Sequence, residues 1–79
     1  MKKHVCYLCD INYDECVYLN FFATFASAET YLRGIADVFA TVENLDVSDL
    51  MVSNNELEIC CGDEVLFILK IKVEGENQR

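Results

Sequence analysis

A change in hydrophobic period is the feature that most constrains how this chain can fold. From Ala28 to Val42 the apolar residues recur at three- and four-residue steps, which is typical of an amphipathic helix lying on a sheet. On both sides of this segment the apolar residues alternate with their neighbours, as they do in strands. Ser27 is the expected N-cap of the helix, and Glu29 in the first turn suits the helix dipole.

The segments on either side of the helix predict five strands. The chain contains no proline, so these strands can run unbroken. Asn12-Tyr13-Asp14 supplies turn residues for a first hairpin, and Asn54-Asn55 and Gly62-Asp63 fit two-residue hairpin loops. The expected strands cover residues 3–11, 15–25, 47–53, 56–61 and 64–73.

The resulting order, β-β-α-β-β-β, predicts an α+β fold. We expect a two-layer sandwich in which one helix covers one face of a five-stranded antiparallel sheet. At 79 residues the chain is expected to form one domain, over residues 1–74, with a flexible C-terminal tail at 75–79. The order of the strands within the sheet stays open.

One helix can cover only one face of such a sheet. The odd-numbered residues of the first, second, fourth and fifth strands are almost all apolar and are expected under the helix. The opposite face then holds large apolar side chains mixed with His4, Asp10 and Asn20, whereas a free sheet face is usually mostly polar. Such a patch is typical of a protein interface, with scattered surface hydrophobes as the alternative. The predicted sheet-face patch consists of Leu8, Tyr18, Phe22, Leu66 and Ile68.

Five cysteines in a small chain raise the question of a zinc site or a disulfide framework. Cys6 and Cys9 have the C-x-x-C spacing, and Cys60-Cys61 could complete a set of four thiolates. In a strand, however, residues three apart point to opposite faces, and neighbours diverge as well. We therefore expect all five to be small hydrophobic residues in a reducing cell, with no metal and no cofactor.

Candidate catalytic groups are few. The only histidine, His4, shares a strand face with Cys6, but their Cβ atoms would lie about 7 Å apart, beyond hydrogen-bond reach. Asp10 is too far along the strand to orient this histidine. The chain has no calcium loop, no glycine-rich phosphate loop and no H-x-x-x-H pair. These features favour a protein that is not an enzyme.

The N-terminal region indicates in which cellular compartment the protein is expected. Lys2 and Lys3 imitate the charged start of a signal peptide, but the apolar stretch from Val5 to Ile11 contains Cys9 and Asp10 and has no cleavage site. No apolar run approaches the ~18 residues of a membrane span. We therefore expect a cytoplasmic protein.

The charge is strongly negative and unevenly distributed. Fourteen Asp and Glu stand against six Lys and Arg, a formal net charge of -8. Between His4 and Leu69 lie twelve acids and one base, Arg33, so this stretch carries -11. Direct binding to nucleic acid or to anionic membranes is disfavoured, because both depend on Lys and Arg. The remaining bases lie near the ends of the chain: Lys2, Lys3, Lys70, Lys72 and Arg79.

A small acidic domain without catalytic groups can bind a protein partner that has a basic surface. The leading hypothesis is a non-catalytic inhibitor that docks on a basic, nucleic-acid-binding groove, as phage- and mobile-element-encoded anti-defence proteins of the anti-CRISPR kind do. Acidity for solubility alone is the simpler interpretation. The rival hypotheses are a homodimeric accessory subunit joined by the sheet-face patch and, less favoured, a zinc or redox protein. The expected partner-binding acids are Asp10, Asp14, Glu15, Glu56, Glu58, Asp63 and Glu64.

Overall fold

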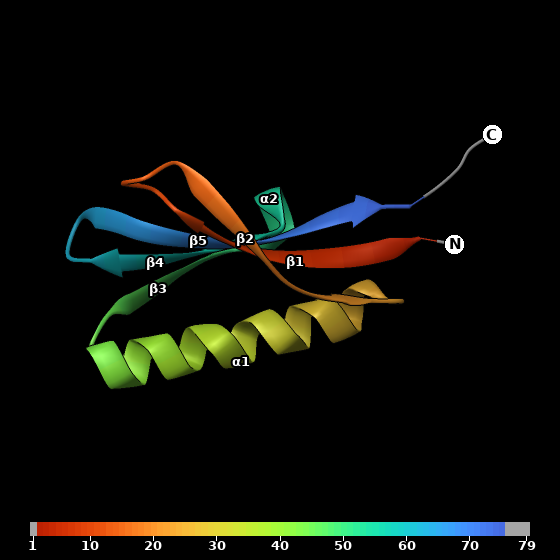
Figure 1. Ribbon diagram of the computed structural model, residues 1–79. Helices are drawn as coiled ribbons and strands as arrows, with labels where there is room; N and C mark the ends of the chain where they lie inside the picture. The colour runs from red at the N-terminus through yellow and green to blue at the C-terminus, as the bar shows by residue number, and fades with distance from the viewer. Residues whose placement is uncertain (1, 76–79) are drawn as a thin grey trace.

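The computed structural model describes residues 2–75 and shows a five-stranded antiparallel sheet with a long helix across one face (Figure 1). The predicted fold class and order of elements are confirmed, with one short helix added. Of the predicted flexible tail, residues 76–79 lie outside the described residues. The elements are β1 (Lys3–Asp10), β2 (Glu15–Phe22), α1 (Phe25–Glu43), β3 (Asp46–Leu50), α2 (Met51–Asn54), β4 (Glu56–Cys61) and β5 (Glu64–Glu74).

The strand order is β2-β1-β5-β4-β3, so the first and last strands of the chain are neighbours at the centre of the sheet. β1 pairs with β5 from Lys3 opposite Glu74 to Asp10 opposite Phe67. β2 and β3 form the two edges. The crossover through α1 therefore joins one edge of the sheet to the other, and the helix lies diagonally over the strands between them (Figure 1).

Helix α1 begins earlier than the sequence predicts. Thr24, in extended conformation, is the N-cap, and its side-chain oxygen accepts a hydrogen bond from the N–H of Ser27 at 3.2 Å. Ser27 therefore lies inside the first turn, and the prediction that it caps the helix is wrong. Glu29 falls in the second turn, where it bonds to Arg33 instead of lying at the helix end. At the other end Asn44 adopts the left-handed conformation of a C-cap (φ 57°).

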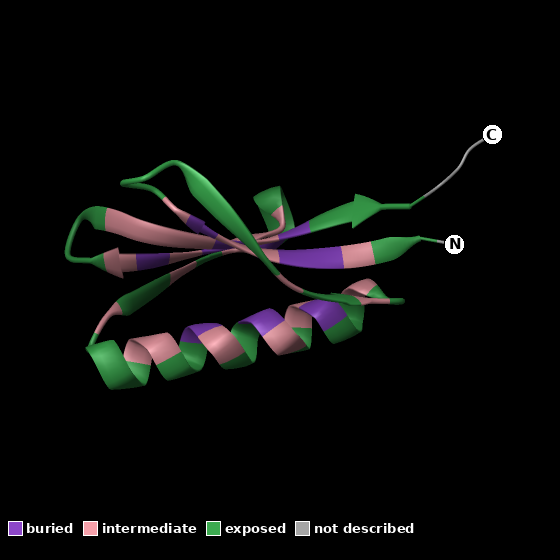
Figure 2. Ribbon diagram, in the orientation of Figure 1, coloured by how far each residue is buried: buried purple, intermediate pink, exposed green. Residues whose placement is uncertain are grey.

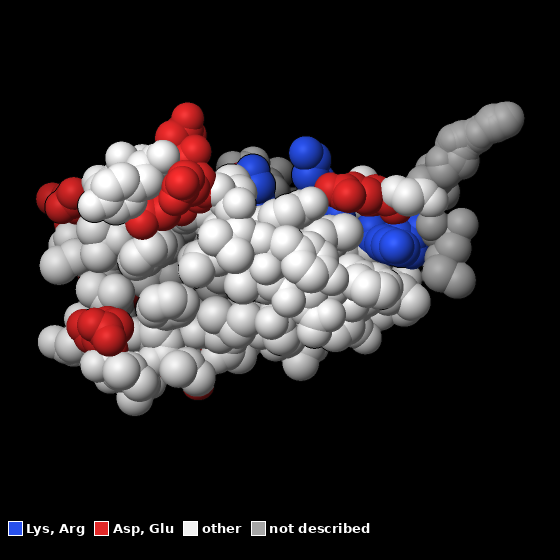
Figure 3. Space-filling model, in the orientation of Figure 1, with Lys and Arg blue, Asp and Glu red and all other residues white. Residues whose placement is uncertain are grey.

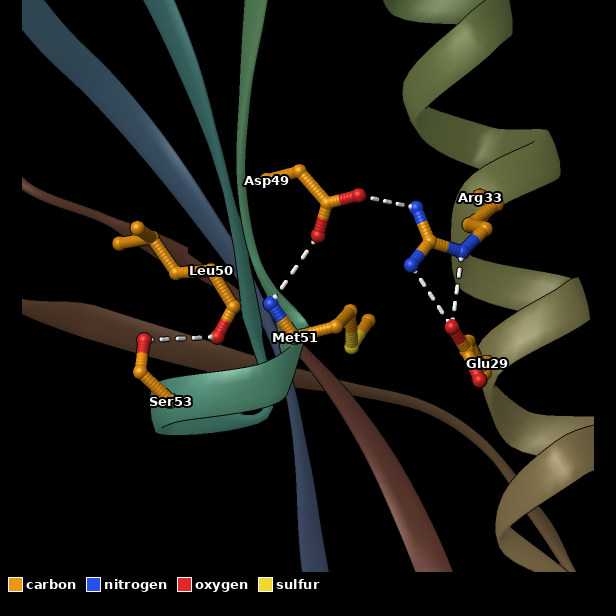
Figure 4. Close-up of polar contacts among 6 residues, drawn as sticks. All are labelled: Glu29, Arg33, Asp49, Leu50, Met51 and Ser53. Atoms are coloured by element: carbon orange, nitrogen blue, oxygen red, sulfur yellow. Dashed lines mark hydrogen bonds and ion pairs between the residues drawn. The ribbon is translucent and has the colours of Figure 1, made fainter.

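The predicted strand at 47–53 is confirmed as far as Leu50, but its last three residues and the two-residue hairpin loop at Asn54-Asn55 are wrong. β3 ends at Leu50, and Met51–Asn54 form the single turn of α2. Two local bonds compete with the strand (Figure 4): Asp49 Oδ1 accepts from the Met51 N–H at 3.1 Å, and Ser53 Oγ donates to the Leu50 carbonyl at 3.3 Å. The turn directs Met51, which is only 4% exposed, into the core.

The core lies between α1 and the sheet face that it covers, where the buried residues gather (Figure 2). The prediction for the last two strands is confirmed, because odd-numbered residues of β4 and β5 line this layer. Small Ala28 and Ala36 on the helix flank the fully buried Leu32. The core cluster is Cys6, Ala28, Leu32, Ala36, Met51, Leu57, Ile59, Leu69 and Ile71.

In β1 the predicted faces are reversed. Even-numbered Cys6 and Leu8 lie on the helix side, opposite Ile71 and Leu69 of β5, and the Cys6 thiol points to the Ala28 carbonyl (3.9 Å). Both faces of this strand are largely apolar, so alternation alone cannot choose between them. The register with β5 decides which face of β1 lies under the helix, because paired residues share a face of the sheet.

The face of β2 changes along the strand. Its register with β1 shifts between Cys6 and Tyr7, and at this irregularity Leu19 packs against the core. Beyond it Phe22 also lies under the helix, with its ring centroid 5.1 Å from that of Tyr31. Phe22 was predicted on the open face, as were two residues of β1, Leu8 and His4. All three lie on the helix side, where the His4 ring packs edge-on against Phe25 at 6.2 Å.

A disulfide joins Cys9 to Cys16 across the first hairpin. The two residues are direct partners in the β1–β2 register, with their Cα atoms 4.0 Å apart. The prediction that all five cysteines are unpaired is therefore wrong. The three free thiols are those of Cys6, Cys60 and Cys61.

Replacing Leu32 with alanine tests the core. This side chain is fully buried, so its removal leaves a cavity under the helix and should lower the free energy of unfolding by about 3 kcal/mol. Chemical denaturation followed by circular dichroism measures the change. Val52→Ala is the control, because Val52 is fully exposed on α2 and its truncation should cost almost nothing.

Alkylation tests the disulfide. Protein purified without reductant should take up label at Cys6, Cys60 and Cys61 once unfolded, whereas prior reduction should add Cys9 and Cys16. Reduction should also lower the free energy of unfolding by about 2 kcal/mol, because the bond closes a short loop. Mass spectrometry counts the labels, with Cys16→Ser as the control. Equal labelling before and after reduction would contradict the pairing.

Candidate functional site

The acids that the sequence separates are gathered at one end of the sheet. Asp10 of β1 pairs with Phe67 of β5, and the Ile11 N–H donates to the Leu66 carbonyl at 3.2 Å. The β1–β2 turn therefore lies beside the start of β5 and hence near the β4–β5 turn. The start of β3 reaches the same end, because Asp46 pairs with Cys60. We call these residues the acidic end: Asp10, Asp14, Glu15, Glu43, Asp46, Asp63 and Glu64.

The molecule is 45 Å long, and Lys3 and Lys72 lie toward the end opposite the acidic end. Lys3 pairs with Glu74 and Lys72 with Val5, so both strands carry their lysines away from the hairpin turns. The Lys3 amine lies 4.8 Å from the centroid of the Phe21 ring. In Figure 3 the red groups gather mainly at the left of the view, while the blue groups lie from its upper middle to its right, with one red patch beside them. The molecule is therefore polarised along its long axis.

The charges of the acidic end are not neutralised by ion pairs within residues 2–75. The salt bridges in this part of the chain are both made by Arg33, to Glu29 and to Asp49. In the β1–β2 turn Asp10 accepts from the Asn12 N–H at 2.9 Å, and Asp14 takes the left-handed conformation (φ 53°). The carboxylates thus project from tight turns into solvent, where their summed field can attract cations.

Five of the seven predicted partner-binding acids belong to the acidic end. Glu56 and Glu58 do not: they lie on the open sheet face, where Glu56 pairs with Lys70 and Glu58 with Ile68. Sequence reasoning missed Glu43 and Asp46. Both come shortly after the predicted helix. This position would have placed them at the acidic end if the direction of the helix over the sheet had been known.

A shallow hollow of about 320 Å³ lies beside the β1–β2 turn. It joins the acidic end to the disulfide, with Lys70 on its far wall. Carboxylates beside apolar groups suit a lysine or arginine side chain, whose stem can pack while its charge is paired. Within residues 2–75 no three His, Cys, Asp or Glu side chains are grouped to hold a metal ion. The hollow is lined by Cys9, Asp10, Ile11, Asp14, Glu15, Cys16, Glu56, Ile68 and Lys70.

The one base within the acidic stretch, Arg33, joins α1 to β3 (Figure 4). Its guanidinium donates twice to Glu29 Oε2, at 2.9 and 2.7 Å, and once to Asp49 Oδ2 at 2.6 Å. The hydrogen bond from Arg33, followed by that from the Met51 N–H, lowers the pKa of Asp49 below its usual range. The two carboxylates in turn raise the pKa of Arg33. This base is thus occupied by local pairs and does not offset the acidic end.

Neither Cys6 nor Cys60 is placed as an activated nucleophile. Burial raises the pKa of the Cys6 thiol, and burial followed by the charges of Glu58 and Asp46 raises that of Cys60. A raised pKa favours the thiol over the reactive thiolate. His4 Nδ1 is buried and has no hydrogen-bond partner within residues 2–75, so it is not paired with Cys6.

The predicted sheet-face patch is smaller than expected, because Leu8 and Phe22 pack under the helix. Of its remaining members, Tyr18 lies beside Tyr7, with ring centroids 6.5 Å apart, while Leu66 and Ile68 are half-buried. Charged residues of β4 and β5 divide the surface, and the Tyr7 hydroxyl donates to Glu74 at 2.8 Å. Over residues 2–75 this face is therefore mixed and carries no continuous apolar surface.

In comparisons with protein-family models, curated proteins and solved structures, none matches this chain. In residues 2–75 neither α1 nor α2 combines the length and the apolar character that crossing a bilayer requires.

Replacing Arg33 with glutamine tests the link between α1 and β3. Because the folded-state pKa of Asp49 is lowered, its pairing stabilises the fold above the ordinary Asp pKa of about 3.9, and this stabilisation is lost as the pH falls through the lowered value. The melting temperature of the variant should be slightly below that of the wild type at neutral pH. This difference in melting temperature should vanish in acid. Carboxyl NMR titration should show the Asp49 pKa rising in Arg33→Gln, and an unchanged pKa would contradict the contact.

Proposed function

We propose that this chain is a non-catalytic protein-binding module whose acidic end docks on a basic surface of a protein partner, namely a groove that holds nucleic acid. The observation that carries the proposal is the gathering of carboxylates on two adjacent hairpin turns, with no ion pair to any of them within residues 2–75. A basic groove offers lysine and arginine in the density that such a surface can pair.

The rigidity of this end supports the proposal. Both turns are closed by strand pairing, and the Cys9–Cys16 disulfide ties the first hairpin within one or two residues of its acids, Asp10, Asp14 and Glu15. Surfaces that are ordered before binding lose less conformational entropy on association. The polarity of the molecule would also orient it during approach, with the acidic end leading toward a basic partner.

Small acidic inhibitors encoded by phages and mobile elements, such as anti-CRISPR proteins, are the class that this surface fits best. A cytoplasmic location belongs to the same proposal. The disulfide weighs against that location, because such bonds are rare in a reducing cytosol. The hairpin register does not require the bond, so the acidic end would persist with both thiols reduced.

Charge reversal at the two turns tests the proposal. In Asp14→Lys/Asp63→Lys each substitution adds two charges, taking the net charge from -8 to -4. Partners captured from an extract of the encoding organism should include nucleic-acid-binding proteins that duplex DNA or RNA displaces. Their affinity for the reversed variant, measured by biolayer interferometry, should fall by about tenfold or more and depend on salt.

The matched control is Asp37→Lys/Glu74→Lys, which has the same net charge but changes exposed acids on α1 and at the opposite end of β5. It should bind nearly as well as the wild type. Equal loss in both variants would show that only net charge matters, and binding that nucleic acid does not displace would exclude the proposed groove.

A further inference from the structure

We infer that the edge of β2 pairs with β2 of a second copy of this chain, forming a symmetric dimer with one continuous sheet and both α1 helices on the same side. This inference is independent of the acidic end and concerns a different surface. It also moves the expected dimer contact from the open sheet face, which is mixed and charged, to the strand edge and the flank of the helix beside it.

The two edges of the sheet differ in how open they are to pairing. β3 has five residues, two of them aspartates, and is followed at once by the turn of α2. Short, charged edges resist pairing with another chain. β2 has eight residues, and Glu15 at its start is its one charged residue. A long, largely uncharged edge strand is a template for a further strand.

The outward-facing backbone groups of β2 can be assigned from its pairing with β1. The 4.0 Å separation of the Cys9 and Cys16 Cα atoms is that of a pair not hydrogen-bonded to each other, so the Cys16 N–H and carbonyl point away from β1. The same holds for Tyr18, two residues on. At Phe21 the N–H is instead taken by the Asn20 side chain at 2.8 Å. The free groups therefore lie around Val17, where a two-fold axis can pass.

Helix α1 presents an apolar flank next to this edge. A groove of about 430 Å³ runs along it, lined by Tyr31, Gly34, Ile35, Val38, Phe39, Val42 and Glu43. Val38 and Val42 are 62% and 70% exposed, and Val17 of β2, on the helix side of the sheet, is 56% exposed. Exposed aliphatic side chains gathered in this way mark an interaction surface.

A second copy fits this surface because of the charge distribution. Two chains of charge -8 repel one another least where they meet through a face with few acids, and Glu43 is the one acid that lines the α1 groove. Between the acidic end and the lysines, Figure 3 shows such a face over α1 and β2. Antiparallel pairing of β2 with itself also reverses the two molecules, so the acidic turn at Asp14 comes opposite the other copy's Asn20, which adjoins Phe21, the residue over which Lys3 lies.

A stable dimer sets a minimum size for this contact. A specific interface needs roughly 800 Å² from each partner, which is about a sixth of the 5059 Å² surface of this chain. A strand edge alone is a narrow ribbon. Because the axis is perpendicular to the sheet, the α1 flanks of the two copies lie on the same side of it, and the proposed contact includes their exposed valines.

The test is the mass of the purified chain in solution and its response to one charge. Light scattering and sedimentation equilibrium on the wild type should give about twice the 9.0 kDa chain mass at high micromolar concentration. Val38→Glu places like charges against the facing helix and should raise the dimer dissociation constant by at least about tenfold. Val52→Glu, the same change at a fully exposed residue on the other edge, should leave it unaltered.

A wild-type mass of one chain at every concentration would overturn the inference. So would a dimer that Val38→Glu does not weaken, or one that Val52→Glu weakens equally. Nuclear Overhauser effects between labelled and unlabelled copies provide a measurement that needs no variant: contacts should appear around Val17, and contacts confined to the open sheet face would place the dimer elsewhere. Because these tests use the chain alone, their failure leaves the proposed acidic docking untouched.

Discussion

The pairing of β1 with β5 is the interaction on which the rest of the structure depends. It brings the two ends of the chain together at the centre of the sheet, with Lys3 opposite Glu74 and Asp10 opposite Phe67. It also chooses which face of β1 lies under the helix, by setting Cys6 and Leu8 beside Ile71 and Leu69. As a result, the β1–β2 turn and the β4–β5 turn lie at the same end of this central pair.

The same pairing separates acidic groups from basic groups along the molecule. Acids that lie in two separate turns become neighbours, while lysines near the two chain ends are brought together at the other end. Among the bases of residues 2–75, Lys70 lies at the hollow beside the acidic end, and Arg33 holds α1 against β3. The acidic end, the mixed open face and the uncharged side formed by β2 and α1 are thus three surfaces of different chemistry on one small domain.

Periodicity predicted the fold class, the helix and the strands of β4 and β5, because each of these has one clearly apolar side. It failed where both sides are apolar, as in β1, whose orientation is decided by β5, at the other end of the chain. The disulfide escaped prediction because it depends on the hairpin register, which sequence alternation leaves open. At Met51, local side-chain bonds from Asp49 and Ser53 overrode a strand-like pattern.

The central claim is that the fold concentrates binding charge at one end of the molecule. The most direct measurement is amide chemical-shift mapping while an oligolysine peptide is added. Resonances of the acidic end, such as those of Asp14 and Asp63, should shift first and return on addition of salt, while those of Lys3 and Lys72 stay in place. Shifts centred on Glu56 and Glu58, or spread evenly over the surface, would contradict the account.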